Sequence, residues 1–210
     1  MKIKKIIDIS MDLNEKTLVW IKDPQPKLTP ILRTPKDPVN FTWLDFGGHA
    51  GTHVDAPFYL YGDKWTADQI PFDRLIGGCQ VIDLTKIDDM ITEEDLKKVK
   101  ITKKMVLLKT KNSLDPLTKY NPNHVAMTVD SAKYLVKKGI TTIGYDYQSF
   151  EREGKNEVHT VFLSKDIVVI DNLRLKEAEA KYYTLICLPI KLTGTDAAPS
   201  RAILVEENEK

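Results

Sequence analysis

Two of the four histidines, His49 and His53, lie four residues apart, and Asp55 follows two residues later. Imidazole nitrogen and carboxylate oxygen together suit Zn²⁺, Mn²⁺ or Fe²⁺. A helix would place both histidines on one face. Glycines at 47, 48 and 51 disfavour a helix, and Pro57 favours an extended conformation at the residue before it. The pattern predicts an extended metal-binding segment, and a glycine-rich loop with incidental histidines is the alternative.

The extended conformation also predicts how this segment would hold its ion. Residues 49, 53, 55 and 59 share parity, and in a strand they tend to share a face. Gly51 would let the backbone bend so that the two imidazoles converge. A catalytic metal needs about three protein ligands and one open position. His49, His53 and Asp55 provide three ligands for a divalent ion, which we expect to be Zn²⁺ or Mn²⁺.

Other side chains are candidates for supporting roles around such an ion. Asp45 or Asp146 could orient the imidazoles. Thr52 and the N–H groups around Gly51 could donate to a developing oxyanion. Arg152 could pair with a substrate carboxylate, although a surface ion pair is the simpler interpretation.

Aromatic side chains could line a substrate pocket beside the ion. Trp20 and Tyr147 are the two for which we expect substrate binding. Packing in the core is the alternative for both, because aromatic residues dominate core packing.

The chain reads as strands with few helices. We expect strands at 5–10, 39–46, 79–84, 105–109, 140–146, 167–170, 183–192 and 202–205. Residues 128–138 show the clearest helical pattern, which Gly139 ends. Thr92 begins a shorter helix, and 159–164 form a short helix or turn. Five prolines between 24 and 38 predict an irregular arm without regular structure. This mixture predicts an α/β fold with a mixed β-sheet core, as one domain over 1–210.

Composition excludes several classes of function. The chain has 31 basic and 30 acidic side chains, so its net charge of +1 would not draw it to nucleic acid or anionic lipid. The sequence has no run of eighteen apolar residues, so we expect no membrane span. The N-terminus is too short and too polar for a signal peptide. A cytoplasmic location follows as the default. Cys79 and Cys187 lie in apolar segments, where we expect buried residues rather than a disulfide framework.

The segment from His49 to Tyr59 resembles the signature His-x-Gly-Thr-His-x-Asp-x-Pro-x-His of the cyclase family. Ten of the eleven positions are consistent with that signature, and the exception is Tyr59 in place of the last histidine. The family contains bacterial kynurenine formamidases and related metal-dependent hydrolases. The resemblance implies a compact β/β/α arrangement, described as a swivelling domain, in a homo-oligomer (a dimer or tetramer).

The resemblance also implies a second set of ligands. The family has a histidine on a later helix and an acid about twelve residues on, and here His159 and Asp171 have that spacing. Asp55 would bridge two ions. The family usually has glutamate where this chain has Asp171, so the second ion could be lost, weakened or shifted. A surface or core histidine and a turn-capping aspartate are the alternatives for these two residues.

Tyr59 bears most directly on activity, because the family's histidine at this position is thought to shuttle a proton to a leaving amine. A phenol titrates near pH 10 and an imidazole near 6.5, so Tyr59 is a poor base. His124, Glu151 or Glu153 could carry the proton instead. Tyr59 could equally be an aromatic wall.

The resemblance predicts a metal-dependent hydrolase that cleaves an amide, lactone or cyclic imide of a small-molecule substrate. It would use one or two divalent ions, Zn²⁺ or Mn²⁺, and arylformamidase activity itself is in question. A relative that binds metal or a small molecule without catalysis is the alternative. Nucleic-acid binding is a poor third, because no basic patch or recognition motif is present.

Overall fold

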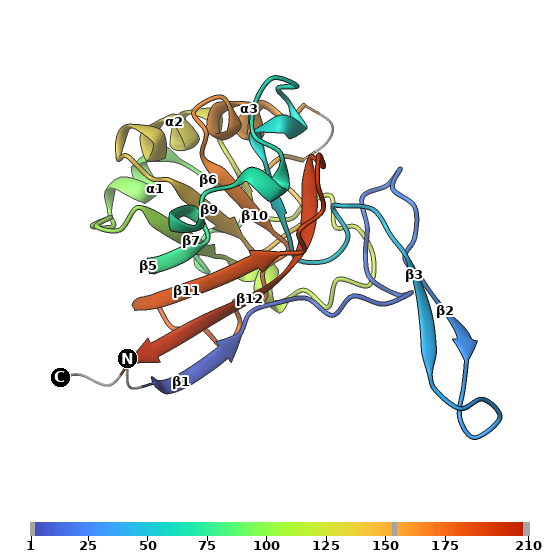
Figure 1. The fold of residues 1–210 in the computed structure, drawn as a ribbon. Helices are drawn as coiled ribbons and strands as arrows, with labels where there is room; N and C mark the ends of the chain where they lie inside the picture. Colours follow the sequence, from blue (N-terminus) through green and yellow to red (C-terminus); the bar gives the residue numbers. More distant parts are fainter. Residues whose placement is uncertain (1–2, 153–154, 208–210) are drawn as a thin grey trace.

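A computed structural model describes residues 3–152 and 155–207. Its main feature is a closed ring of strands (Figure 1). The order is β12 (Ala197–Glu207), β11 (Tyr182–Pro189), β5 (Ile76–Asp83), β7 (Met105–Lys109), β9 (Thr142–Tyr145), β10 (Val168–Asp171) and β4 (His53–Asp55). The short strand β4 closes the ring because it pairs with β10 on one side and β12 on the other. Strand β1 (Ile3–Asp8) extends the sheet beyond β12.

The ring encloses one hydrophobic core and carries a second on its outside. Inward side chains such as Val54, Leu107 and Leu185 are fully buried within the ring. The outward side chains of β7 and β9 pack against the helices, as Ile143 and Leu108 do. Because β5, β7, β9 and β10 run parallel, both of their faces must be covered. This explains the apolar runs in β7 and β10.

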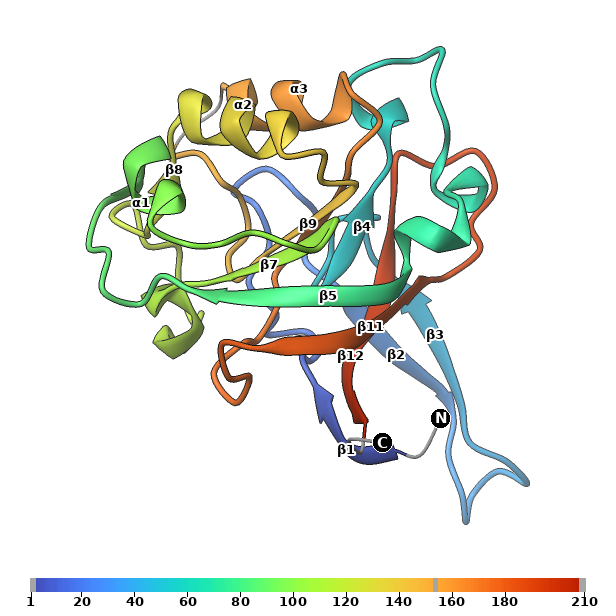
Figure 2. The ribbon, with the colours of Figure 1, turned by 90° about the vertical axis from the view of Figure 1, so that its left-hand side faces the viewer.

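Three short helices cover one side of the ring, α1 (Glu93–Lys97), α2 (Val129–Lys137) and α3 (Glu157–Leu163) (Figures 1 and 2). Thr92 caps α1 as expected, and Thr128 likewise accepts a bond from the first turn of α2. Gly139 ends α2 with a φ of 74°, a conformation that favours glycine. The remaining elements are small: β6 (Met90–Ile91), β8 (Ala126–Met127), and the 3₁₀ turns η1 (Pro57–Tyr59), η2 (Ala67–Gln69), η3 (Phe72–Arg74) and η4 (Lys111–Leu114).

Contrary to expectation, the proline-rich arm is not wholly irregular, because residues 27–32 form a strand that pairs with the strand expected at 39–46. It forms a hairpin of β2 (Lys27–Leu32) and β3 (Phe41–Asp45), which extends away from the ring (Figures 1 and 2). Pro30 is tolerated because the strands pair only with each other and the register shifts between Pro30 and Leu32.

The last strand also differs from its expected range. We expected a loop from 194 to 200, but β12 begins at Ala197, and Ala197, Ala198 and Pro199 pair with β4. Small residues and a proline gave no strand signal there. The two cysteines are free and buried, as expected. None of the described helices is long and apolar enough to cross a membrane.

Candidate metal centre

The strand β4 presents two of the expected ligands from the middle of the ring. His53 and Asp55 are alternate residues of β4, and both side chains are buried. Gly51 has a φ of 66°, so the chain turns just before β4, as glycine readily allows. This turn brings His49 back toward His53, with 3.3 Å between His49 Nδ1 and His53 Nε2. The expected bend at Gly51 is present, but only residues 53–55 are extended, because His49 lies in a turn and Tyr59 on η1.

The first cluster consists of His49, His53 and Asp55. Asp55 Oδ1 lies 3.1 Å from His49 Nδ1 and 3.3 Å from His53 Nε2. These three ligand atoms thus form a triangle with sides of 3.1 to 3.3 Å. A tetrahedral ion with bonds of 2.0 to 2.1 Å separates its ligand atoms by about 3.3 Å. The triangle has the size that such an ion requires.

The second cluster shares Asp55 and adds His159 and Asp171. His159 comes from α3 and Asp171 is the last residue of β10, which pairs with β4. His159 Nε2 lies 3.3 Å from Asp171 Oδ2 and 3.9 Å from Asp55 Oδ2. The ligand atoms of this group all lie within 4.8 Å of one another. Asp55 therefore turns one oxygen to each cluster, the geometry of a bridging carboxylate.

Each of the three imidazoles has an oxygen acceptor against its outer nitrogen. His53 Nδ1 lies 2.8 Å from the Gly51 carbonyl, His49 Nε2 lies 2.9 Å from Asp196, and His159 Nδ1 lies 2.7 Å from Glu151. An acceptor at these positions requires an N–H there, which leaves the inner nitrogen of each neutral ring with a lone pair. Such partners fix the tautomer and ring orientation of histidines that bind metal.

Unpaired polar atoms test whether a metal ion fits. Metal ligation requires neutral rings. In the tautomers just described, the facing nitrogens of His49 and His53 are then both acceptors and cannot bond each other. Asp55 Oδ1 and Asp171 Oδ1 are buried without a hydrogen-bond partner. A buried acceptor left unpaired costs about 1–3 kcal/mol. A divalent cation at each cluster would satisfy these atoms, so the residues fit the group.

The acidic groups give the centre a strongly negative potential. Burial opposes a charged ring, yet the carboxylates of Asp55 and Asp196 raise the pKa of His49 to about 10. Burial likewise opposes the charged form of Asp55, but His49 and His53 hold the pKa of that carboxyl well below its usual range. Burial raises the pKa of Asp171, and the nearby Asp55 charge adds to the rise. This potential favours a bound cation.

Tyr59 lies over the clusters, on η1. Its ring centroid is 4.7 Å from that of His49 and 6.4 Å from that of His159. Burial, assisted by the charge of Asp55, raises the pKa of Tyr59 to about 12. The phenol is therefore protonated at neutral pH and can donate a hydrogen bond.

A cavity of about 750 Å³ opens onto the centre. Its lining includes the five expected ligands, Tyr59 and the segment from Trp20 to Asp23. Trp20 meets the Tyr120 ring edge-on at 5.8 Å between centroids. Tyr147, the other expected substrate contact, is not in this lining. It is fully buried, stacks on His124 at 4.2 Å, and accepts a bond from the Asn121 N–H, so it serves the core.

Several expected supporting roles are corrected by the structure. Thr52 Oγ1 is buried and occupied, since it donates to the Asn172 carbonyl and accepts from the Met11 N–H. Asp146 accepts from Thr110 and Ser113 rather than from an imidazole. Asp45 is exposed at the end of the hairpin. These errors arose because spacing alone does not show which way a side chain points.

Neither of the described alternative proton carriers, His124 and Glu151, lines the cavity. His124 is buried outside the cavity lining, and burial lowers its pKa. Glu151 holds His159 and is not in the lining, and Glu153 lies outside the described residues. Arg152 forms the expected ion pair, with Asp89.

Two acids that orient the imidazoles were not assigned that role from the sequence. Asp196 lies immediately before β12, in a stretch expected to be a loop, so nothing placed it beside His49. Glu151 binds the His159 ring with Oε2 and the N–H groups of Val158 and His159 with Oε1. An acid a few residues before a helix that bears a candidate ligand is the signal that could have found it.

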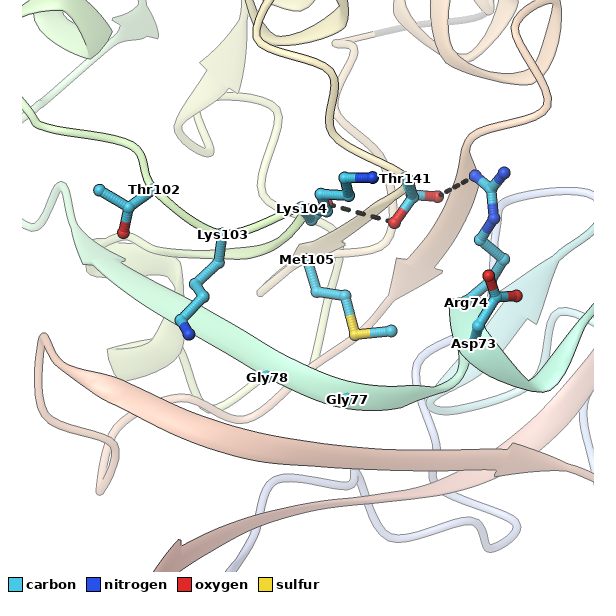
Figure 3. Close-up of a pocket in the computed structure, with 9 residues that line it drawn as sticks. All are labelled: Asp73, Arg74, Gly77, Gly78, Thr102, Lys103, Lys104, Met105 and Thr141. Carbon is cyan, nitrogen blue, oxygen red and sulfur yellow. Dashed lines mark hydrogen bonds between the residues drawn. The ribbon is translucent and has the colours of Figure 1, made fainter.

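A second hollow, of about 410 Å³, lies at the start of β5 and β7 (Figure 3). Its basic groups do not converge: Arg74 donates to the Thr141 carbonyl, whereas Lys103 lies over the Tyr182 ring. Its lining contains no histidine or cysteine. The chemistry of the described chain is therefore concentrated in the larger cavity.

Comparison with known proteins agrees with this geometry. The model of the Cyclase family, described as "Putative cyclase", matches residues 7–152. A kynurenine formamidase from Salinibacter ruber is 30% identical over 204 residues, which cover 95% of this chain and 96% of that protein. A solved structure titled as a potential metal-dependent hydrolase with cyclase activity is 32% identical, with a TM-score of 0.85, and covers 98% of this chain and 99% of that one.

An isatin hydrolase bound to a product analogue has the same fold, with a TM-score of 0.87 at 20% identity. That alignment covers 97% of this chain and 93% of the isatin hydrolase. The family model spans more than half of this chain, and full-length relatives reach 30% identity. The protein therefore belongs to the Cyclase family and is a hydrolase.

Proposed function

We propose that this protein is a metal-dependent hydrolase that cleaves the C–N or C–O bond of an amide, lactone or cyclic imide with an activated water molecule. The observation that supports this most is the convergence of three imidazole nitrogens and two carboxylates, with each imidazole held from outside by an oxygen acceptor. Two buried carboxylate oxygens without partners complete the argument for a cation. The names of the relatives agree with this reaction class.

When bound, a divalent ion would lower the pKa of water and polarise the scissile carbonyl. The protein's own residues supply the rest. His49, His53 and Asp55 would hold one ion, and His159 and Asp171 would hold a second with the other oxygen of Asp55. Asp196 and Glu151 keep the rings of His49 and His159 oriented. The cavity wall from Trp20 to Asp23 would position the substrate above them.

Tyr59 is the residue we propose as the proton donor. Burial and the charge of Asp55 raise the pKa of Tyr59, so the hydroxyl is protonated at neutral pH and can donate to a leaving group. An amine leaves poorly unless it receives a proton, whereas a stabilised enolate or alkoxide leaves more easily. Lactones and strained rings are therefore the better substrates, and N-formylkynurenine the poorer one.

Either Zn²⁺ or Mn²⁺ is proposed as the metal. Two nitrogens and one carboxylate in the first cluster suit Zn²⁺ in a tetrahedral site. The second cluster has two carboxylates and one imidazole, a set that also suits Mn²⁺. Its spacing of 3.9 Å between His159 and Asp55 is looser than the first triangle. We infer that the first cluster binds more tightly.

The test combines metal analysis with turnover. Protein loaded separately with zinc and manganese would be assayed for bound metal by mass spectrometry and for hydrolysis of N-formylkynurenine, isatin and simple lactones. We expect at least one ion per chain and hydrolysis of a ring substrate. Metal without turnover of any of them would instead favour a non-catalytic binding role. No bound metal after loading would refute both.

The remaining properties are proposals of the same standing. We propose one domain over 1–210, a cytoplasmic location, and a homo-oligomer, either a dimer or a tetramer. Sedimentation of the purified protein measures the last of these directly.

A further inference from the structure

Asn172 directly follows Asp171 at the end of β10, and its side chain reaches back to the histidine motif. The residue belongs to the cavity lining, yet it is only 2% exposed. Its backbone has a φ of 59°, a left-handed conformation that glycine adopts freely and that asparagine tolerates. The chain therefore places a buried amide next to a ligand of the second cluster and within reach of the first.

The amide group of Asn172 donates to the Gly51 carbonyl. Nδ2 lies 3.0 Å from that oxygen, and His53 Nδ1 lies 2.8 Å from the same oxygen. A carbonyl oxygen has two lone pairs, so it can accept both hydrogen bonds. The two donors together fix the direction of the carbonyl. One peptide group thus joins the amide of Asn172 to the ring of His53.

The amide of Asn172 can face Gly51 in one orientation only. A carbonyl oxygen at 3.0 Å needs a donor, so the NH₂ group must point toward it and Oδ1 must point elsewhere. In this orientation Oδ1 is buried without a hydrogen-bond partner. A buried acceptor without a partner destabilises the fold. A side chain that only filled space would not need to carry this penalty, so the bond to Gly51 calls for a role.

The main chain of Asn172 is held at both of its polar groups. Its N–H donates to the Tyr147 carbonyl at 2.9 Å, and its carbonyl accepts from Thr52 Oγ1 at 2.7 Å. Any residue that tolerates the left-handed backbone could make these two bonds. Among the hydrogen bonds of the described residues, the one from Nδ2 to Gly51 alone requires the asparagine side chain.

We propose that Asn172 is a positioning residue of the metal centre, because its amide fixes the Gly51 carbonyl and, through it, the His53 ring. This rests on the proposed metal-dependent function, in which His53 Nε2 is a ligand atom. Gly51 lies in the bend before β4, where no strand pairing holds its carbonyl. Without the amide, the carbonyl would be held only by the ring that it has to orient.

The first experiment measures zinc affinity by competition with a chelating dye. Asn172→Gly removes the side chain and keeps the left-handed backbone, which glycine adopts freely. We expect it to bind zinc about tenfold more weakly at the tighter site, the lower end of the range for groups that orient metal ligands. Asn172→Ala, which retains Cβ, is a second variant and should show the same loss.

Asn112→Gly is the matched control for this measurement. Asn112 is also a buried asparagine, and its Nδ2 donates to the Val125 carbonyl, but it does not line the cavity. The control should lose stability and still bind zinc like wild type. If Asn172→Gly binds zinc as tightly as the control, the asparagine serves only the backbone turn and the proposal is overturned.

The second experiment observes the His53 ring in metal-free protein by nitrogen-edited NMR. In wild type, the N–H at His53 Nδ1 should exchange slowly with water, and in Asn172→Gly this exchange should be at least tenfold faster. The N–H at His159 Nδ1, which Glu151 holds, is the internal reference and should not change. A general loss of stability would speed exchange at both rings, whereas release of the Gly51 carbonyl affects His53 alone. Equal exchange at His53 in the two proteins overturns the proposal.

The two readouts separate this proposal from the proposed function. If wild-type protein binds no zinc, the metal-dependent function fails, and the NMR comparison in metal-free protein still decides whether Asn172 positions His53. If zinc binds but no substrate is turned over, both measurements remain decisive, because neither depends on catalysis.

Discussion

At the scale of single residues, the unusual feature of the site is a phenol where the family's signature has an imidazole. Tyr59 lies between His49 and His159 and stays protonated because burial raises its pKa to about 12. A histidine there would titrate near neutral pH and could both take and give a proton. The site therefore retains a donor but lacks the usual proton shuttle.

We predict that Tyr59→Phe lowers kcat about 10- to 100-fold with little effect on bound metal, because a proton donor is lost and the ligands are untouched. Tyr59→His should gain activity on N-formylkynurenine. Its pH profile should show a new acid limb near 6 to 7, whereas wild type should show no limb from Tyr59 below about pH 10. Equal kcat for wild type and Tyr59→Phe would show that Tyr59 donates no proton and only forms part of the cavity wall.

Glu151 is the second residue with a testable role, because one carboxylate serves both the His159 ring and the start of α3. Burial opposes its charge, but His159 lowers the pKa of Glu151 to about 2, so it is ionised throughout the working range. We predict that Glu151→Gln weakens zinc binding about 10- to 100-fold, as measured by competition with a chelating dye. Glu157→Gln, an exposed change on the same helix, should bind zinc like wild type.

At the scale of elements, the sequence located most of the strands that build the ring. Strand β7 has its expected bounds, and the cap of α1 was predicted from Thr92 because capping is a local interaction. The bend at Gly51 was predicted for the same reason, although only residues 53–55 are extended. Strand β3 lies within the strand expected at 39–46, but β2 was missed because prolines mask its strand signal. The first residues of β12 were missed because their pairing depends on a distant strand rather than on local propensity.

The same contrast between local and long-range interactions explains which residues of the site were found from the sequence. The ligands were found because they lie in a short motif or at a motif-like interval. Asp196 was missed because it reaches His49 only after β12 has paired with β4, which brings together residues about 140 positions apart. Long-range pairing of this kind leaves no trace in local spacing.

Gly48, in the loop before His49, lies close to the backbone of β12, and this contact gives a prediction at this scale. A Cβ on Gly48 would lie 2.8 Å from the Ala197 carbonyl oxygen, whereas a Cβ on Gly47 would meet nothing within 4 Å. In Gly48→Ala, the backbone beside His49 must therefore move away from the backbone beside Asp196. We expect at least a tenfold loss of zinc affinity in Gly48→Ala and no loss in Gly47→Ala, by the same dye competition. Similar affinities in both variants would show that the loop adapts without cost.

At the scale of the whole molecule, the centre joins three parts of the chain. His49, His53 and Asp55 come from the loop and β4, His159 comes from α3, and Asp171 comes from β10. An ion held by either cluster binds only the folded chain, so its binding free energy adds to the free energy of unfolding.

We predict that zinc at about 100 times its Kd raises the free energy of unfolding by about 2.7 kcal/mol. For a chain of this length that corresponds to a rise in Tm of about 5–10 °C, which chelator should reverse. His53→Gln should abolish the rise. His124→Gln, a buried histidine outside both clusters, should lower the baseline Tm but keep the zinc-dependent rise, as scanning calorimetry would show.

The double pairing of β4 has a consequence for how such a protein can change. Its three residues are hydrogen-bonded to a neighbour on each side, so His53 and Asp55 cannot shift without breaking two ladders. The segment at 20–23 has no comparable anchorage and still touches the cavity. Mutation can therefore remodel what enters the cavity while leaving the ion-holding scaffold intact, and directed evolution toward new ring substrates should begin with those four wall positions.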